Sequence, residues 1–137
     1  MVQMKVDYQG EKLCQLTHGP SGSQIQTDAP TDNGGKGSRF SPTDLMGAAL
    51  GSCILTTMDI LAQKEGRKIN LQGALAEVGK EMSGPPRRIS RLQVKITMPK
   101  GIAAADRAFL NEVVHACPVA RSLHPDLKID AQVVYPD

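Results

Sequence analysis

The sequence predicts a single α+β domain in which short strands flank one long central helix. Residues 45–58 are almost all apolar or small, and they lie between a helix start signal and a glycine stop. Segments on both sides of this run alternate apolar and polar residues with the period of two that marks half-buried strands. A chain of 137 residues suffices for one core, so we expect one domain over residues 1–137.

The central helix is predicted over residues 41–66. Ser41 has the character of an N-cap, Pro42 that of a first helical residue, and Asp44 that of the acidic member of a capping box. Gly66 supplies the usual stop. Because the middle of the helix shows no polar face, we expect protein to cover it on all sides.

A membrane span is the alternative interpretation of this helix, because residues 45–62 are mostly apolar. Asp59 and several hydroxyl side chains interrupt the run, which favours the core helix of a soluble protein. Gly47 and Gly51 are unfavourable inside a helix, so they predict a close neighbour. A neighbouring helix, from the same chain or from a second subunit, is the natural candidate, and simple tolerance of glycine is the other explanation.

The segments before the central helix are predicted to form a short meander of three strands, over residues 2–8, 12–18 and 23–28. Residues 29–39 are rich in glycine and lack an apolar pattern, so we expect a flexible connection. A phosphate-binding loop is the functional alternative for such glycines. Neither the GxxxxGK[ST] nor the GxGxxG spacing is present, which argues against it.

The segments after the central helix predict a hairpin, two helices and a last strand. The hairpin covers residues 70–82 and 89–98, and the helices cover 103–116 and 118–123. Pro118 suits the first position of the second helix. With a final strand over 128–135, the predicted order is βββ-α-ββ-αα-β.

Composition excludes several classes of function. The net charge is only +2 with both signs mixed along the chain, and aromatic residues make up 3%. We therefore expect neither nucleic-acid binding nor attachment to an anionic membrane. The N-terminus lacks the pattern of a secretory signal, so we expect a cytoplasmic protein.

The chain contains three cysteines, Cys14, Cys53 and Cys117. An odd number without a CxxC pair predicts neither a disulfide framework nor a zinc ribbon. His18, His115 and His124 could join these thiols in space, but their spacing matches no known ligand pattern. We therefore expect no metal and no cofactor.

The three thiols differ in their sequence surroundings. Cys117 precedes a proline at a predicted helix start, where backbone N–H groups can lower the pKa of a thiol. His115 and Arg121 lie nearby in sequence and could add positive charge. Cys53 lies among apolar residues, so it would need a polar partner from elsewhere in the fold to become reactive. Cys14 is interpreted as a small buried apolar residue.

The run SPTDLMGAALGSCILTTMDILAQKEG, followed 64 residues after its cysteine by HACPVARSL, resembles the OsmC/Ohr family of thiol-dependent peroxide reductases. The resemblance implies an intertwined homodimer with two long central helices enclosed by sheets. It also implies that Cys53 attacks an organic or inorganic peroxide to form a sulfenic acid, which Cys117 converts to a disulfide that a dithiol reduces. Such antioxidant chemistry needs an apolar substrate pocket, for which the candidates are Leu45, Met46, Ala49, Leu50 and Ile54.

Two positions depart from the peroxidase branches of that family, in which an arginine in the early turn and a glutamate before the cysteine activate the thiol. The turn of this chain contains His18 and no arginine, and Thr43 occupies the glutamate position. The chain therefore resembles the less characterised OsmC-like branch. Asp44 and Arg39 are candidate substitutes, with a helix cap and a solvated charge as their alternative roles.

These departures leave alternative functions open. One is a redox-sensing or small-molecule-binding protein that keeps the dimeric scaffold without efficient peroxidase turnover. Another is a metal-binding or purely structural role. Under both of these, His18 is a candidate site residue.

Overall fold

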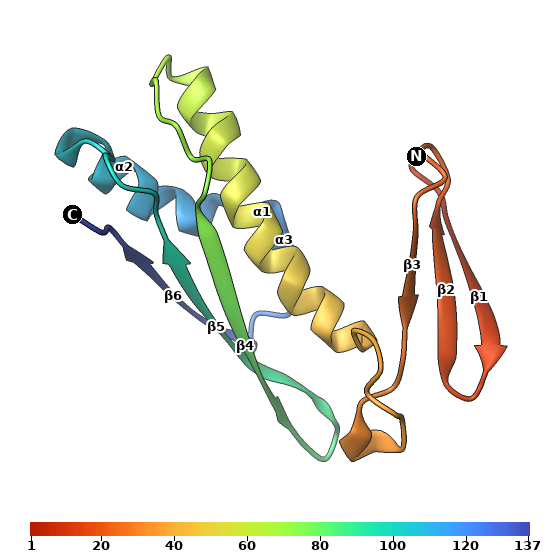
Figure 1. Cartoon of the computed structure of the whole chain (residues 1–137). Coiled ribbons are helices and arrows are strands. Elements are labelled where there is room, and N and C mark those ends of the chain that lie inside the picture. The colour runs from red at the N-terminus through yellow and green to blue at the C-terminus, as the bar shows by residue number, and fades with distance from the viewer. The chain divides into compact units, whose positions relative to one another are not determined.

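The computed structural model describes residues 1–137 and contains two compact units, Met1–Met46 and Gly47–Asp137. We call them the N-terminal unit and the C-terminal unit. Each contains one three-stranded sheet (Figure 1). The predicted α+β class and the βββ-α-ββ-αα-β order are confirmed, with two short 3₁₀ helices in addition. The assignment of one domain to residues 1–137 stays a prediction.

The sheet of the N-terminal unit is the predicted antiparallel meander. It consists of β1 (Met4–Gly10), β2 (Leu13–His18) and β3 (Gln24–Thr27). Side chains alternate between the two faces of a sheet, and the register places one apolar set together on one face. That set is Met4, Val6, Tyr8, Cys14, Leu16 and Ile25. Met4, Val6, Tyr8 and Ile25 are exposed, so the N-terminal unit by itself does not cover this apolar face.

The connection between β3 and the central helix contains one turn of 3₁₀ helix, η1 (Thr31–Asn33). The connection therefore has regular structure over three residues, and its predicted flexibility stays a prediction. Asp28 is buried, and its carboxylate accepts hydrogen bonds from the backbone N–H and the hydroxyl of Ser38 at 3.0 and 2.7 Å. These hydrogen bonds close the loop and lower the pKa of the Asp28 carboxyl.

The central helix is α1 (Pro42–Lys64), with the predicted start and end. The hydroxyl of Ser41 accepts a hydrogen bond from the backbone N–H of Asp44 at 3.0 Å, and the carboxylate of Asp44 accepts one from the N–H of Ser41 at 2.9 Å. This reciprocal pair is a capping box. Gly66 follows the helix with a φ of +68°, which favours glycine.

One stripe of α1 is buried, and it comprises Gly47, Leu50, Gly51, Ile54, Thr57, Met58 and Ala62. Ile60 remains 51% exposed, so the C-terminal unit by itself covers α1 along one stripe, and cover by protein on all sides stays a prediction. A single sheet covers only one side of a helix. By length and mean hydropathy, 1.6 over its most apolar window, α1 could also cross a membrane, although core helices of soluble proteins pass the same test.

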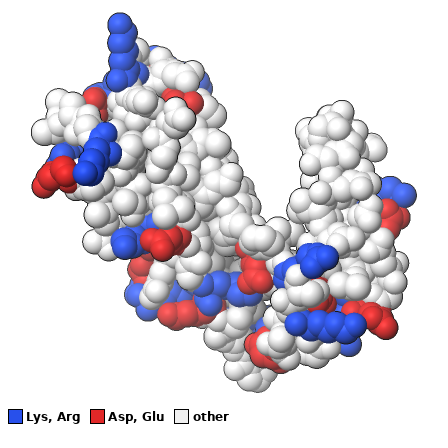
Figure 2. Space-filling view, in the orientation of Figure 1, with Lys and Arg blue, Asp and Glu red and all other residues white.

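The sheet of the C-terminal unit contains β4 (Leu75–Ser83), β5 (Arg88–Thr97) and β6 (Lys128–Val134), in the order β4-β5-β6. The hairpin of β4 and β5 is confirmed, and β6 pairs with β5 in parallel. A parallel pair needs a crossover, which α2 (Ala104–Val113), η2 (Val114–Ala116) and α3 (Pro118–Ser122) provide. Figure 2 shows Lys and Arg next to Asp and Glu on the visible face of this unit.

The two glycines of α1 lie against this sheet. A Cβ atom added to Gly51 would lie 3.0 Å from Cγ2 of Val78 and 3.4 Å from Cβ of Ala76. One added to Gly47 would lie 3.5 Å from Val78 and from Leu92. The predicted close neighbour is confirmed, but the prediction of a helix is wrong, because the neighbours are strands. A glycine permits close approach whatever the approaching element is.

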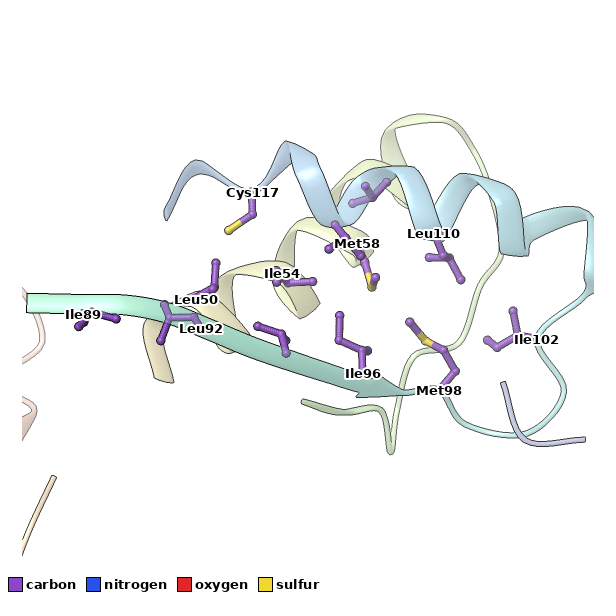
Figure 3. Packing of buried hydrophobic residues seen from close by; sticks show 13 residues of the cluster. Leu50, Ile54, Met58, Ile89, Leu92, Ile96, Met98, Ile102, Leu110 and Cys117 are labelled. Carbon is purple, nitrogen blue, oxygen red and sulfur yellow. The ribbon is translucent and has the colours of Figure 1, made fainter. Parts of the chain in front are cut away.

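The core of the C-terminal unit lies between α1, the sheet and α2 (Figure 3). Leu50, Ile54 and Met58 of α1 are fully buried. They meet a second set from β5, α2 and the adjoining loops, which includes Leu92, Ile96, Met98, Leu110 and Cys117. Figure 3 shows Cys117 at the end of this cluster where Leu50 lies.

Candidate thiol site

Two of the three cysteines meet in the C-terminal unit. Cys53 lies in the middle of α1, and Cys117 lies between η2 and α3. Their side chains lie close enough for each thiol to shift the pKa of the other, although 64 positions separate the two residues in the sequence. Cys14 belongs to β2 in the N-terminal unit.

The backbone around Cys117 explains how its thiol reaches α1. Pro118 opens α3, and a proline favours an extended conformation in the residue before it. Cys117 has φ −61° and ψ 125°, so the chain leaves η2 and enters α3 through this residue. The thiol of Cys117 is 0% exposed. Burial, followed by the hydrogen bond with Cys53, raises the pKa of Cys117, so this thiol stays protonated and can donate.

The pKa of the Cys53 thiol shifts in the opposite direction. Burial acts to raise the pKa of the Cys53 thiol, but hydrogen bonds from Cys117, the backbone N–H of Val119 and the hydroxyl of Thr57 lower it, and the net pKa is below the ordinary value. The Thr57 hydroxyl oxygen lies 3.8 Å from the sulfur. Cys53 is only half-buried, whereas Cys117 is fully buried. Cys53 is therefore the thiol of the pair better suited to attack an external molecule.

Cys53 was expected to need a polar partner from elsewhere in the fold, and neither Thr57 nor Val119 was predicted as one. Thr57 follows Cys53 by four residues, and this spacing places two side chains on the same face of a helix. That signal was available in the sequence. The N–H of Val119 comes to Cys53 through the tertiary fold, and no local pattern indicates it.

The five predicted pocket residues do not share one environment. Leu50 and Ile54 are 0% exposed and face the core. Ala49 is exposed on α1. Leu45 and Met46 belong to the first turns of α1 in the N-terminal unit, where Leu45 is half-buried and Met46 is exposed. Their role as a common substrate pocket stays a prediction.

Two predicted polar partners of the thiol, His18 and Arg39, have local contacts within the N-terminal unit. Nδ1 of His18 lies 2.6 Å from the hydroxyl oxygen of Ser21 in the turn after β2. The guanidinium of Arg39 donates to the backbone carbonyl of Ser38 at 2.8 Å. Their part in thiol chemistry stays a prediction.

The other two predicted partners, Thr43 and Asp44, lie in the first turn of α1. The hydroxyl of Thr43 is 3.1 Å from that of Ser41, and Asp44 forms the capping box. Asp44 thus has the helix-cap role that the sequence analysis gave as its alternative. Ten residues separate Thr43 from Cys53 along the chain.

The arrangement of the two thiols supports dithiol–disulfide chemistry. A half-buried thiol with a lowered pKa lies near a second thiol that stays protonated, which is the pairing that thiol–disulfide exchange and sulfenic-acid resolution require. No group of three or more His, Cys, Asp or Glu side chains lies close enough together to hold a metal ion.

Comparison with protein families identifies the chain. A family model described as OsmC-like protein matches residues 35–132. The chain belongs to the OsmC-like protein family. A search of curated proteins finds no match to this OsmC-like protein.

Solved structures support the same assignment. This OsmC-like protein is 40% identical to a crystal structure from Psychrobacter arcticus 273-4, of a protein provisionally named for osmotic stress induction and a detoxification response. The match covers 99% of this chain and 96% of that chain, with a TM-score of 0.87.

Two more distant structures share the fold of this OsmC-like protein. An organic hydroperoxide resistance protein OsmC from Legionella pneumophila is 15% identical, with coverages of 100% and 97% and a TM-score of 0.73. An organic hydroperoxide resistance protein from Elizabethkingia anophelis is 14% identical, with coverages of 99% and 96% and a TM-score of 0.76.

Proposed function

We propose that this OsmC-like protein reduces peroxides through a cycle of its two paired thiols. Cys53 is the attacking thiol and Cys117 is the resolving thiol. The observation that carries the proposal is that a half-buried thiol of lowered pKa and a buried thiol of raised pKa lie near enough to act on each other. A thiolate is the nucleophilic form of cysteine, and a second thiol within reach limits its over-oxidation.

The cycle balances in three steps. The Cys53 thiolate attacks one oxygen of the hydroperoxide, the O–O bond breaks, and the departing alkoxide takes a proton to become an alcohol, which leaves a sulfenic acid on Cys53. The Cys117 sulfur then attacks the sulfenic sulfur, and its proton leaves with the hydroxide as water, which forms the disulfide. An external dithiol reduces this disulfide by exchange and becomes a disulfide itself.

The names of the related proteins support a peroxide as the substrate. The Legionella pneumophila and Elizabethkingia anophelis proteins, which share the fold, are named for organic hydroperoxide resistance. The Psychrobacter arcticus protein is named for a detoxification response. The apolar residues around Cys53 favour an alkyl hydroperoxide, because an apolar surface binds its hydrocarbon part.

The test is peroxide consumption with dithiothreitol as the dithiol and cumene hydroperoxide or hydrogen peroxide as the oxidant. We expect Cys53→Ser to abolish consumption and Cys117→Ser to stop after one turnover, while the matched control Cys14→Ser keeps the full rate. Mass spectrometry of the oxidised protein should find the Cys53–Cys117 disulfide. A wild-type rate no higher than that of Cys53→Ser would reject the proposal.

We also propose that two copies of the chain form a homodimer. The N-terminal unit by itself does not cover the apolar face of the β1-β2-β3 sheet, where Met4, Val6 and Tyr8 are exposed by 71%, 61% and 70%. Apolar residues on the open side of α1, such as Ile60, are exposed too. Large exposed apolar patches mark interaction surfaces, and the OsmC/Ohr resemblance implies a second copy as the partner.

Light scattering after size-exclusion chromatography tests the dimer. We expect twice the chain mass of 14.7 kDa for the wild type. Val6→Lys places a charge on the apolar face and should give monomer or aggregate, whereas the matched control Gln24→Lys, on the polar face, should stay dimeric. A wild-type monomer at micromolar concentration contradicts the dimer but leaves the thiol cycle to be judged by its own assay.

A further inference from the structure

We infer that Thr57 is a catalytic residue, whose hydroxyl donates a hydrogen bond to the reacting sulfur of Cys53 and holds it as a thiolate. This inference rests on the proposed peroxide reduction and deepens it. It assigns the activation of Cys53 to neutral donors of the C-terminal unit, namely the Thr57 hydroxyl, the Val119 N–H and the Cys117 thiol.

The first observation is the direction of the Thr57 hydroxyl. Thr56 follows the usual habit of helical threonines, since its hydroxyl donates to the backbone carbonyls of Ser52 and Cys53 at 3.1 and 3.2 Å. The Thr57 hydroxyl instead lies 3.8 Å from the sulfur of Cys53, which is its only hydrogen-bond partner. Two adjacent threonines in one helix thus have different hydrogen-bond partners, and only Thr57 has the thiol as its partner.

The second observation is burial. Thr57 is only 9% exposed, and a hydroxyl removed from water needs a hydrogen-bond partner. A neutral thiol is a weak acceptor, whereas a thiolate is a strong one, so the buried hydroxyl favours the ionised sulfur. Valine has the shape of threonine and no hydroxyl, so it would fill the same space without burying a hydroxyl that needs a hydrogen-bond partner.

The third observation concerns charge. No Lys, Arg or His contributes to the lowered pKa of Cys53, and Cys117 is the only titratable group that acts on it. The remaining donors come from separate elements, Thr57 from α1 and Val119 from α3. Oriented neutral donors around a developing anion replace a positive charge without being titrated themselves. Thr57 gives up no proton in the cycle and keeps its donor role in every turnover.

The pH profile of Cys53 alkylation tests this inference without peroxide. Iodoacetamide modification of the Cys53 peptide is followed by mass spectrometry between pH 5 and about pH 10, which brackets ordinary thiol titration. We expect Thr57→Val to slow alkylation at pH 7 about three- to tenfold and to move the midpoint to higher pH, because one hydrogen bond to the anion is lost. At the high-pH end the alkylation rates of the variant and the wild type should converge, since the Cys53 thiol is then ionised in both.

Two further variants separate a donor role from a packing role. Thr57→Ser keeps the hydroxyl and should keep the wild-type midpoint, and the matched control Thr56→Val should keep it too. Thr57→Ala serves in place of Thr57→Val if the valine variant does not fold. An unchanged midpoint in Thr57→Val, a midpoint in Thr57→Ser that moves as far as in Thr57→Val, or slowing by the same factor at every pH would overturn the inference.

The peroxide assay distinguishes this inference from the proposed function. If the wild type consumes no peroxide while Thr57→Val still moves the alkylation midpoint, the proposed function fails, Thr57 still stabilises the thiolate, and its catalytic assignment is overturned. If the wild type consumes peroxide, we expect Thr57→Val to lower the single-turnover rate at pH 7 by the same factor as alkylation. A full peroxide rate in Thr57→Val would contradict the catalytic role.

Discussion

Replacing Gly51 with alanine tests how closely α1 lies on β4, and Gly47 provides the matched control. Both glycines lie on the buried stripe of the same helix, one turn apart. Alanine is favoured over glycine inside a helix by about 0.8–1.0 kcal/mol. With no other effect, both substitutions would stabilise the protein by this amount.

The neighbouring side chains separate the two positions. The new Cβ at residue 47 would lie 3.5 Å from its nearest neighbours, which is an ordinary contact. At residue 51 it would lie 3.0 Å from Cγ2 of Val78, whose rotamer is stiff because the side chain is branched at Cβ. Overpacking of this kind costs about 1–3 kcal/mol. We expect Gly47→Ala to stabilise by about 1 kcal/mol and Gly51→Ala to destabilise by about 1 kcal/mol.

Urea unfolding at one fixed protein concentration measures both changes, since the concentration matters if the protein is a dimer. The double variant Gly51→Ala/Val78→Ala removes the close contact and with it the overpacking cost. The change in its free energy of unfolding should therefore be more favourable than the sum of the two single changes by about 2 kcal/mol. Equal stabilisation by Gly47→Ala and Gly51→Ala would refute the reasoning, because it would mean that Val78 does not lie against Gly51.

Three further predictions follow from the described contacts. The alkylation rate of wild-type Cys53 should stay high above its lowered folded pKa and fall as the pH drops through it, and a profile that matches free glutathione in the same tube would contradict this. Ser41→Ala should cost about 1 kcal/mol in urea unfolding because the capping hydrogen bond to Asp44 is lost, whereas Ser41→Thr should keep most of it. The folded pKa of the Asp28 carboxyl is lowered, so its stabilising effect is present above the unfolded pKa and is lost as the pH falls through the folded pKa. Asp28→Asn should remove this part of the acid dependence of the melting temperature. An unchanged acid dependence in Asp28→Asn would contradict the prediction.

Elements with local signals were predictable from the sequence. The start of α1 follows from the spacing of Ser41, Pro42 and Asp44, and the end follows from Gly66. The strands follow from alternation over a few residues each, and α3 from Pro118. These signals work because caps, turns and pleated strands are decided by atoms within a few positions along the chain.

The candidate site was predictable only in part. The surroundings of Cys117 suggested a reactive thiol, but the structure gives it a raised pKa, because burial outweighs the nearby N–H groups. Cys53 was expected to be unreactive because its sequence neighbours are apolar, but hydrogen bonds from three donors lower the pKa of its thiol. Local sequence describes the immediate neighbours of a thiol, whereas its pKa depends on donors that other elements bring.

The sequence by itself determined the order of the elements, the limits of α1 and the presence of two thiols in contexts typical of the OsmC/Ohr family. Only the tertiary structure decided that Cys53 and Cys117 come near enough to shift each other's pKa, that β6 runs parallel to β5, and that strands approach Gly51. The physical reason is range: helix caps and strand alternation act over a few residues, while these contacts join positions tens of residues apart through the packing of one core.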